Sequence, residues 1–222
     1  MELKMPTVKS SRGYDSSSRR AAAQKTRDAT LDAAQKLLLA RGYPGTTIAR
    51  IAADARVSVE TIYKSFGGKP GLVRAIYERG LRGSGSVAAF DRSDAMRTSA
   101  ADAQSLMRAW GELTAEVAES LTPILLLVRS AAASDANMAE LQRRTNAERL
   151  QRMEHNARFL QERGYLREDV GFDEAVDVMW LHSSPELYEL LVLQRGWSTE
   201  RFARYVARSM ADALVRPPHP RH

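Results

Sequence analysis

The stretch from Thr46 to Phe66, TTIARIAADARVSVETIYKSF, constrains the fold more than any other part of the chain. Its first half carries apolar residues at i, i+3, i+4 and i+7, which is the spacing of one helix face: Ile48, Ile51, Ala52 and Ala55. Either Thr46 or Thr47 is able to cap the N–H groups at the start of this helix. The pattern therefore predicts a short amphipathic helix.

A second short helix is predicted directly after a turn over residues 55–57, with Ser58 as its N-cap. One side of this helix carries Val59, Ile62 and Phe66. The other side carries Glu60, Thr61, Lys64 and Ser65. A recognition helix needs one face that packs on its neighbours and one that offers small polar and basic groups to DNA. The stretch therefore predicts a helix-turn-helix, although two short core helices would give a similar pattern.

The distribution of charge favours a polyanionic partner for this part of the chain. Residues 1–82 hold 16 Lys and Arg against 7 Asp and Glu, whereas the remaining residues hold 17 against 20. The positive charge is thus concentrated on the segment that contains the helix-turn-helix, as in nucleic-acid-binding domains. A solubilising basic surface is the alternative interpretation.

Side chains at fixed spacing surround the helix-turn-helix. They are Ala33, Ala34, Leu37, Leu38, Arg41-Gly42-Tyr43, Gly45 to Ile48, Ile51-Ala52, Val57-Ser58-Val59, Thr61-Ile62-Tyr63, Phe66, Lys69 and Leu72. Together they resemble the DNA-binding domain of the tetracycline-repressor (TetR) family of bacterial regulators. The resemblance is close over residues 27–79, with a fainter echo at Gly196-Trp197-Ser198 and Arg201-Phe202.

The resemblance implies an all-α fold: an N-terminal three-helix helix-turn-helix DNA-binding domain followed by a larger helical ligand-binding and dimerisation domain. We place a disordered basic arm at 1–19, the DNA-binding domain at 20–82, the second domain at 95–216 and a flexible tail at 217–222. The resemblance further implies a repressor that binds a palindromic double-stranded DNA operator as a homodimer and is released by a small-molecule effector.

This chain departs from the family pattern at several positions. Arg56 stands at a turn position where glycine is usual, and a left-handed backbone there would cost on the order of 1 kcal/mol. Ala49 stands where many relatives carry a side chain that reads bases. Gly67-Gly68 and Pro70-Gly71 loosen the connection after the second helix. These differences affect the expected operator sequence rather than the fold.

Polar, basic and exposed positions in and around the two helices are the predicted DNA contacts. They are Thr47, Arg50, Ser58, Val59, Glu60, Thr61, Tyr63, Lys64 and Lys69. Tyr63 would be equally comfortable as core, and the resemblance favours a phosphate contact for its hydroxyl. Lys69 lies where a further helix begins, and helix N-termini attract phosphate.

The N-terminal region before the first helix is polar up to about Ser18, and we expect it to be disordered. Basic residues follow at Arg19, Arg20, Lys25 and Arg27. They could form an arm that reaches the DNA backbone or minor groove, or be a frayed basic end. The first helix should run from about Ala21 to Arg41.

From about Ala95 the sequence predicts long helices and almost no strand. One helix covers Ala101 to Ser120, and Pro123 begins another, because proline suits a first helical turn. A third is capped by Ser134 or Asp135 and ends at Gly164. A fourth covers 172–193, with a break at Pro185 as the open alternative, and Ser198 caps the last.

Bulky apolar residues on different helices of the second domain are candidate ligand contacts. They are Trp110, Leu113, Val117, Leu127, Met153, Phe159 and Trp180. For each of them, ordinary core is the favoured interpretation. The last two long helices, which include Pro185 to Leu191 and Arg201 to Leu214, are rich in apolar residues, and we expect them to form the homodimer contact.

Other classes of function find little support. The chain has no cysteine and 4 histidines, and no motif indicates a nucleophile or metal site, so we expect no enzyme, no catalytic residues, no metal and no cofactor. A G-x-G-x-x-A pattern at 83–88 follows a basic helix rather than a strand and is interpreted as a linker. No apolar run is long enough for a membrane span and no secretion signal is visible, so we expect a cytoplasmic protein without a membrane partner. The remaining alternatives are a helical interaction module without DNA binding and an enzyme.

Overall fold

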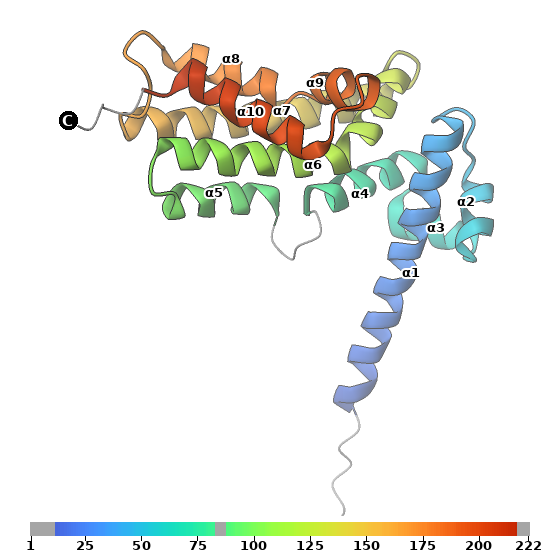
Figure 1. The fold of residues 1–222 in the computed structure, drawn as a ribbon. Coiled ribbons are helices and arrows are strands. Elements are labelled where there is room, and N and C mark those ends of the chain that lie inside the picture. Colours follow the sequence, from blue (N-terminus) through green and yellow to red (C-terminus); the bar gives the residue numbers. More distant parts are fainter. Residues whose placement is uncertain (1–11, 83–87, 217–222) are drawn as a thin grey trace, which may run out of the picture.

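The computed structural model describes residues 12–82 and 88–216, with side chains from residue 17 onward, and it is helical almost throughout (Figure 1). The N-terminal domain consists of α1 (Arg12–Arg41), α2 (Ile48–Ala55), α3 (Val59–Phe66) and α4 (Lys69–Arg82). In the described residues the only strand-like pairing is an isolated antiparallel bridge between Leu166 and Val215. The predicted all-α class, with a helix-turn-helix domain before a larger helical domain, is confirmed.

The second domain is a layered bundle in which α6 runs through the centre (Figure 1). Its elements are α5 (Ala89–Ser99), α6 (Ala103–Ala132), α7 (Ala136–Glu162), α8 (Phe172–His182), α9 (Pro185–Tyr188), the π-helix η1 (Glu189–Gln194) and α10 (Thr199–Leu214). The core of this bundle includes Leu106, Leu160, Met179, Phe202 and Val206, all almost fully buried. None of the described helices has the length and apolar character needed to cross a membrane.

The helix-turn-helix core has the residues that the periodicity predicts. Ile51 of α2 and Ile62 of α3 have no exposed surface, and they pack against Leu31, Leu38 and Leu72 of the neighbouring helices. Because α2 and α3 have only eight residues each, they would be marginal as isolated helices and depend on this packing. The core therefore fixes the angle at which α3 leaves the domain.

The ends of the two short helices are set by side-chain caps and left-handed residues. Thr47, rather than Thr46, caps α2, since its side chain accepts a hydrogen bond from the Arg50 N–H. Arg56 ends α2 in the left-handed region, at φ 56° and ψ 41°. Gly67 ends α3 at φ 73°, where glycine carries no steric cost.

The two domains share one continuous core along α4. The buried cluster that contains Leu72 and Ile76 of α4 also contains Leu121 and Ile124 of α6 and Met138 of α7. The structure therefore couples the orientation of the N-terminal domain to the packing of α6 and α7. The predicted domain boundary near residue 82 divides the sequence, but the buried core continues across it.

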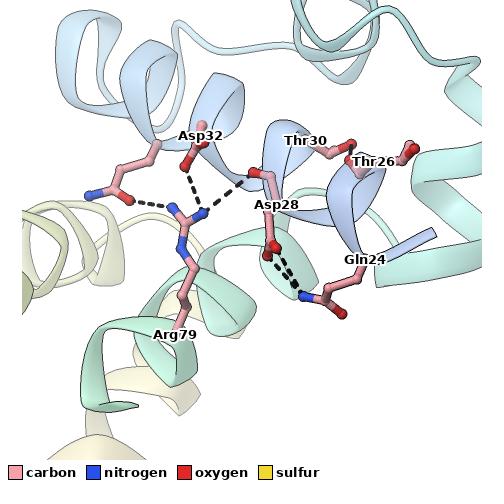
Figure 2. A network of polar contacts seen from close by, with 7 residues as sticks. Gln24, Thr26, Asp28, Thr30, Asp32 and Arg79 are labelled. Atoms are coloured by element: carbon pink, nitrogen blue, oxygen red, sulfur yellow. Dashed lines mark hydrogen bonds and ion pairs between the residues drawn. The ribbon is translucent and has the colours of Figure 1, made fainter. Parts of the chain in front are cut away.

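Arg79 fastens α4 to α1 through the polar network in Figure 2. Its guanidinium donates to the Asp32 carboxylate at 2.7 Å, to the Gln35 side-chain oxygen at 2.9 Å and to the Asp28 backbone oxygen at 3.4 Å. Gln24 holds the Asp28 carboxylate from one turn earlier on α1. Because these contacts join two helices of one domain, α1 and α4 are held together.

The first helix and the middle of the second domain differ from the predictions. α1 begins at Arg12, not near Ala21, so the predicted disordered arm is wrong for residues 12–19; no proline interrupts that segment, and its remainder lies outside the described residues. The predicted break at Pro123 is also wrong, because α6 continues through it. Proline removes one helical hydrogen bond, and burial of Leu121, Ile124 and Val128 on either side holds the helix together.

The later helix boundaries agree better with the sequence. Asp135 caps α7 by accepting from two backbone N–H groups, and Ser198 caps α10. The predicted helix over 172–193 is broken at Ser183-Ser184, so that α8, α9 and η1 replace it. Pro185 occupies the first turn of α9. The helix α5 begins before the predicted start near Ala95, and the glycine pattern at 83–88 lies almost wholly outside the described residues.

Candidate nucleic-acid interface and ligand cavity

The helix α3 offers an outward face of small polar, aromatic and basic side chains. Tyr63 is 56 % exposed and Val59 is 41 % exposed, although both belong to a helix whose other face is fully buried. The rest of this face is also exposed and consists of Glu60, Thr61, Lys64 and Ser65. Val59 thus lies outside the core, with the polar residues rather than with Ile62.

The start of α3 is held by Ser58. Its side chain accepts the Thr61 N–H at 3.0 Å, and the Ser58 and Thr61 hydroxyls lie 2.8 Å apart. This contact satisfies one N–H of the first turn of α3, and the positive end of the helix dipole would favour a phosphate nearby. Lys64 makes no ion pair within the described part of the chain, so its charge is available to a partner.

Tyr63 owes its position to the glycine at 68. Gly68 has φ 108°, and a Cβ there would lie 3.3 Å from Tyr63 Cε1. Glycine therefore allows both the backbone turn and the close approach of the ring. The Gly67-Gly68 pair, which departs from the family pattern, supports the exposed aromatic ring.

The residues of α2 lie beside this face. Thr47 is exposed, but its hydroxyl is engaged as the helix cap. Arg50 is also exposed and lies 3.2 Å from the Asp54 carboxylate one turn later. Since both side chains of that pair contact solvent, the interaction is weak and a phosphate could replace it.

Lys69 has a different environment from the one predicted. Its Nζ donates to the backbone oxygens of Tyr43 at 2.7 Å and Thr46 at 3.1 Å, and lies 4.1 Å from the centre of the Tyr43 ring. The ammonium thus links the first turn of α4 to the loop between α1 and α2. The structure gives Lys69 a role inside the domain, and its predicted phosphate contact stays a prediction.

A cavity of about 510 Å³ lies inside the second domain. Of the predicted ligand contacts, Trp110, Leu113, Val117, Met153 and Trp180 line it. The cavity is also bounded by Tyr77 and Leu81 of α4. Its volume is in the range that holds drug-sized molecules.

Two of the predicted ligand contacts, Leu127 and Phe159, do not line this cavity. Phe159 packs edge-to-face against Tyr165, with ring centres 6.3 Å apart. Leu127 packs against the core cluster shared with the N-terminal domain. Both residues have the helical spacing of residues that line the cavity. Each packs on a different neighbour, which the sequence does not identify.

The cavity also has a polar side that the sequence analysis missed. Arg149 of α7 lies flat on Trp180, with its Cζ 3.3 Å from the ring centre. Its Nη1 donates to the Trp180 backbone oxygen at 2.6 Å and to Ser183 Oγ at 3.1 Å. An arginine within a charged helix such as α7 is usually solvent-facing, so only the long-range packing reveals its position.

Three comparisons with known proteins bear on this arrangement. Residues 31–76, which include α2, α3 and most of α4, match the family model described as bacterial regulatory proteins, tetR family. Over this segment the chain is similar to the tetR family. The match lies within residues 27–79, the region of the sequence resemblance, and it includes α3 with its exposed face.

A curated protein that is similar to part of this chain is an uncharacterised helix-turn-helix transcriptional regulator, YvkB, of Bacillus subtilis (strain 168). It is 44 % identical over 57 residues, which is 26 % of this chain and 30 % of the relative. The chain thus matches less than a third of that relative's length.

Solved structures extend the similarity of fold to the second domain. NalD of Pseudomonas aeruginosa, described as the secondary repressor of a multidrug efflux pump, has a TM-score of 0.67 at 20 % identity, over 88 % of this chain and 98 % of NalD. A complex of SmeT with triclosan has a TM-score of 0.70 at 22 % identity, over 89 % and 99 %. The fatty acid degradation regulator FadR of Bacillus halodurans has a TM-score of 0.68 at 17 % identity, over 83 % and 94 %.

Proposed function

We propose that this protein is a transcriptional repressor that binds a palindromic DNA operator as a homodimer and releases it when a small molecule occupies the cavity of the second domain. The observation that carries this proposal is the exposed face of α3, with Tyr63 and Lys64, on a basic domain whose core holds the helix rigidly. The similarity of fold to NalD, which is described as a repressor, supports repression rather than activation.

The proposed DNA surface combines α3 with the start of α2. Its members are exposed and lie on these two helices or their caps: Thr47, Arg50, Ser58, Val59, Glu60, Thr61, Tyr63 and Lys64. Lys64 and Arg50 would contact phosphates, and Tyr63 would place its ring against the backbone or a base edge. Lys69 supports this surface from behind through the Tyr43 and Thr46 carbonyls.

The two sites are connected by α4. Tyr77 and Leu81 line the cavity, whereas Arg79 on the same helix is held by α1. A molecule that fits the cavity better after α4 has moved would shift the pair of α3 helices in a dimer to another spacing. The shift in DNA affinity equals the difference in ligand affinity between the two arrangements.

An apolar surface near the C-terminus is the proposed dimer contact. Leu181 of α8, Leu190 and Leu193 of η1 and Tyr205 of α10 are each between 39 % and 58 % exposed. Tyr205 packs against Trp197 and lies near His182, so the part of the patch on α8 and α10 is continuous. A two-fold dimer through this surface would present two α3 helices to half-sites roughly 34–36 Å apart, or a multiple of that spacing.

DNA binding is tested by fluorescence anisotropy with a labelled duplex from the region upstream of the protein's own gene. We expect saturable binding at moderate salt, weaker binding to a scrambled duplex of the same composition, and footprints over two inverted half-sites. Equal affinity for both duplexes would contradict the proposal and favour a helical interaction module.

The oligomeric state is tested separately by sedimentation of the native chain and of Leu193→Glu. The native chain should be a dimer, and the variant should shift toward monomer and lose affinity for the full operator while keeping its helical content. A monomeric native chain at micromolar concentration would contradict the proposed assembly.

A further inference from the structure

The cavity lining carries an unbalanced positive charge. Three arginines line it, Arg129, Arg149 and Arg152, together with the single carboxylate of Glu186. Arg129 is paired with Glu186 at 3.0 Å and with Glu189 at 2.9 Å, and Arg152 is paired with Asp94. Arg149 makes no ion pair with any carboxylate in the described part of the chain.

The cationic state of Arg149 persists in spite of its surroundings. Burial lowers the pKa of Arg149, and the Glu186 carboxylate and Tyr77 raise it in part, so that the pKa is about 10. At neutral pH the guanidinium is therefore charged, and a partly buried charge without a counter-ion is unfavourable. An anion in the cavity would relieve that cost.

Hydrogen-bond donors around the cavity also lack acceptors. Only Nη1 of Arg149 donates to a protein acceptor among the described residues. Trp110 Nε1 and Thr122 Oγ1 are buried without any partner, and both residues line the cavity while exposing 4 % and 1 % of their surface. An indole N–H donates and does not accept, but neither of these two buried atoms is accessible, so the open donor edge of Arg149 is the one that a ligand reaches.

Two of the aromatic rings that line the cavity already have a cation over one face. Arg149 lies over Trp180, and Arg152 lies over Phe90 at 4.6 Å from the ring centre. These two ring faces, which would otherwise attract a quaternary ammonium group, are already covered by guanidinium groups. The lining also has apolar side chains on α6, among them Leu113, Val117 and Leu125.

We propose that the effector is an amphipathic carboxylate, whose head group pairs with Arg149 beside Trp180 and whose apolar part lies along the leucine and valine side chains of α6. This inference rests on the proposed effector site and names its chemical class. The free Nε and Nη2 edge of Arg149 gives the geometry of a two-point contact with a carboxylate.

The test uses the tryptophans of the protein as reporters. The chain has three tryptophans; Trp110 and Trp180 line the cavity, whereas Trp197 packs against Tyr205 outside it. Trp197→Phe therefore gives a full-length background in which fluorescence reports on the cavity. Decanoate, decanol and decyltrimethylammonium, each below its aggregation concentration, are titrated without DNA.

We expect saturable binding of decanoate, with decanol weaker by about tenfold or more, as for a hydrogen bond to a charged group, and decyltrimethylammonium weaker still. Arg149→Met should bring decanoate and decanol to the same affinity, whereas the matched control Arg152→Met should keep the preference, because Asp94 retains its ion pair with Arg97. Binding of decanol with unchanged affinity to Arg149→Met would show that the variant is folded.

Three results would overturn the inference. They are the absence of saturable decanoate binding, equal or tighter binding of decanol or the ammonium compound to the native cavity, and an unchanged carboxylate preference in Arg149→Met. Operator release is measured in a separate titration with DNA. Selective decanoate binding without operator release would support the ligand class and contradict the proposed regulation, so the two failures are distinguishable.

Discussion

At the scale of single residues, Arg56 is the position where the backbone is strained. It is the only described residue other than glycine with positive φ, and its side chain is exposed. The N–H groups of Arg56 and Val57 donate to the Ala53 and Ala52 carbonyls, so the turn is well bonded despite the strain. The sequence left the conformation of Arg56 open, and the backbone angles show that it is left-handed.

Replacing Arg56 with glycine should therefore stabilise the domain. We expect Arg56→Gly to raise the free energy of unfolding by about 0.5–1 kcal/mol, because glycine adopts this conformation without a Cβ clash. Urea denaturation measures the change. Arg56→Ala, which removes the side chain but keeps the Cβ, should show no such gain, and an equal gain in both variants would assign the effect to the charge instead.

Tyr77 is a buried phenol at the boundary between the domains. Its hydroxyl donates to Glu148 at 3.4 Å, and burial followed by the Glu148 charge raises the pKa of Tyr77 well above its ordinary value of 10.0. The unfolded chain thus releases this proton at a lower pH than the folded chain. The stabilising contribution is complete below pH 10 and is lost as the pH rises above that value.

The corresponding measurement compares the native chain with Tyr77→Phe in urea between pH 8 and pH 11. The difference in unfolding free energy should stay constant up to about pH 10 and then fall by about 1.4 kcal/mol per pH unit. Tyr43, whose pKa burial and Asp135 raise to about 12, is present in both proteins and cancels. A difference that stays flat to pH 11 would contradict the assigned environment.

At the scale of elements, the crossing of α6 and α10 depends on Gly111. A Cβ at this position would lie 2.7 Å from the Ala203 backbone oxygen and 2.7 Å from Ala207 Cβ. Gly111→Ala should cost about 1–3 kcal/mol of stability, because neither a backbone atom nor a short side chain is able to move away.

The matched control for this substitution is Gly171→Ala. Gly171 precedes α8 and has nothing within 4 Å of an added Cβ, so we expect a change within about 0.5 kcal/mol. Thermal unfolding of both variants tests the crossing. Similar stability of the two would mean that α6 and α10 separate easily.

Lys69 of α4 and Lys64 of α3 differ in their surroundings, so substituting each distinguishes a structural lysine from an exposed one. Lys69→Met would leave the Tyr43 and Thr46 carbonyls without their donor and should cost about 1–3 kcal/mol. Lys64→Met removes an exposed side chain and should change stability by less than about 0.5 kcal/mol. The order of the two midpoints in urea decides between a supporting and a solvent-facing role for Lys69.

Elements whose signals are local could be predicted from the sequence. Ser58, Asp135 and Ser198 are capping residues that act within three positions, and each caps the expected helix. Pro123 shows the limit of such signals, since local chemistry favours a helix start and tertiary burial of its neighbours overrides it. The π-helix η1 has no local signal in the sequence, and none of its six residues is buried.

At the scale of the whole molecule, the site residues divide in the same way. The outward face of α3 follows from the helical periodicity within its eight residues and could be predicted. The cavity depends on how α4, α6, α7 and α8 pack, so Trp110 and Trp180 were identified as bulky residues while Arg149 was not. Phe159 shows the converse, because it has the period of a cavity residue but packs on Tyr165.

On the scale of the whole molecule, α4 joins the domain that carries α3 to the helical bundle (Figure 1), and Tyr77 and Leu81 of α4 line the cavity of that bundle. The central claim is that the outward face of α3 contacts duplex DNA. The most direct test is the salt dependence of binding to the upstream duplex for the native chain, Lys64→Met and Tyr63→Ala, with Arg143→Met on α7 as the control. The account predicts a steep loss of affinity with salt, a slope reduced by about one in Lys64→Met, weaker binding in Tyr63→Ala and no change in Arg143→Met. Native affinity and an unchanged slope in both α3 variants would contradict it.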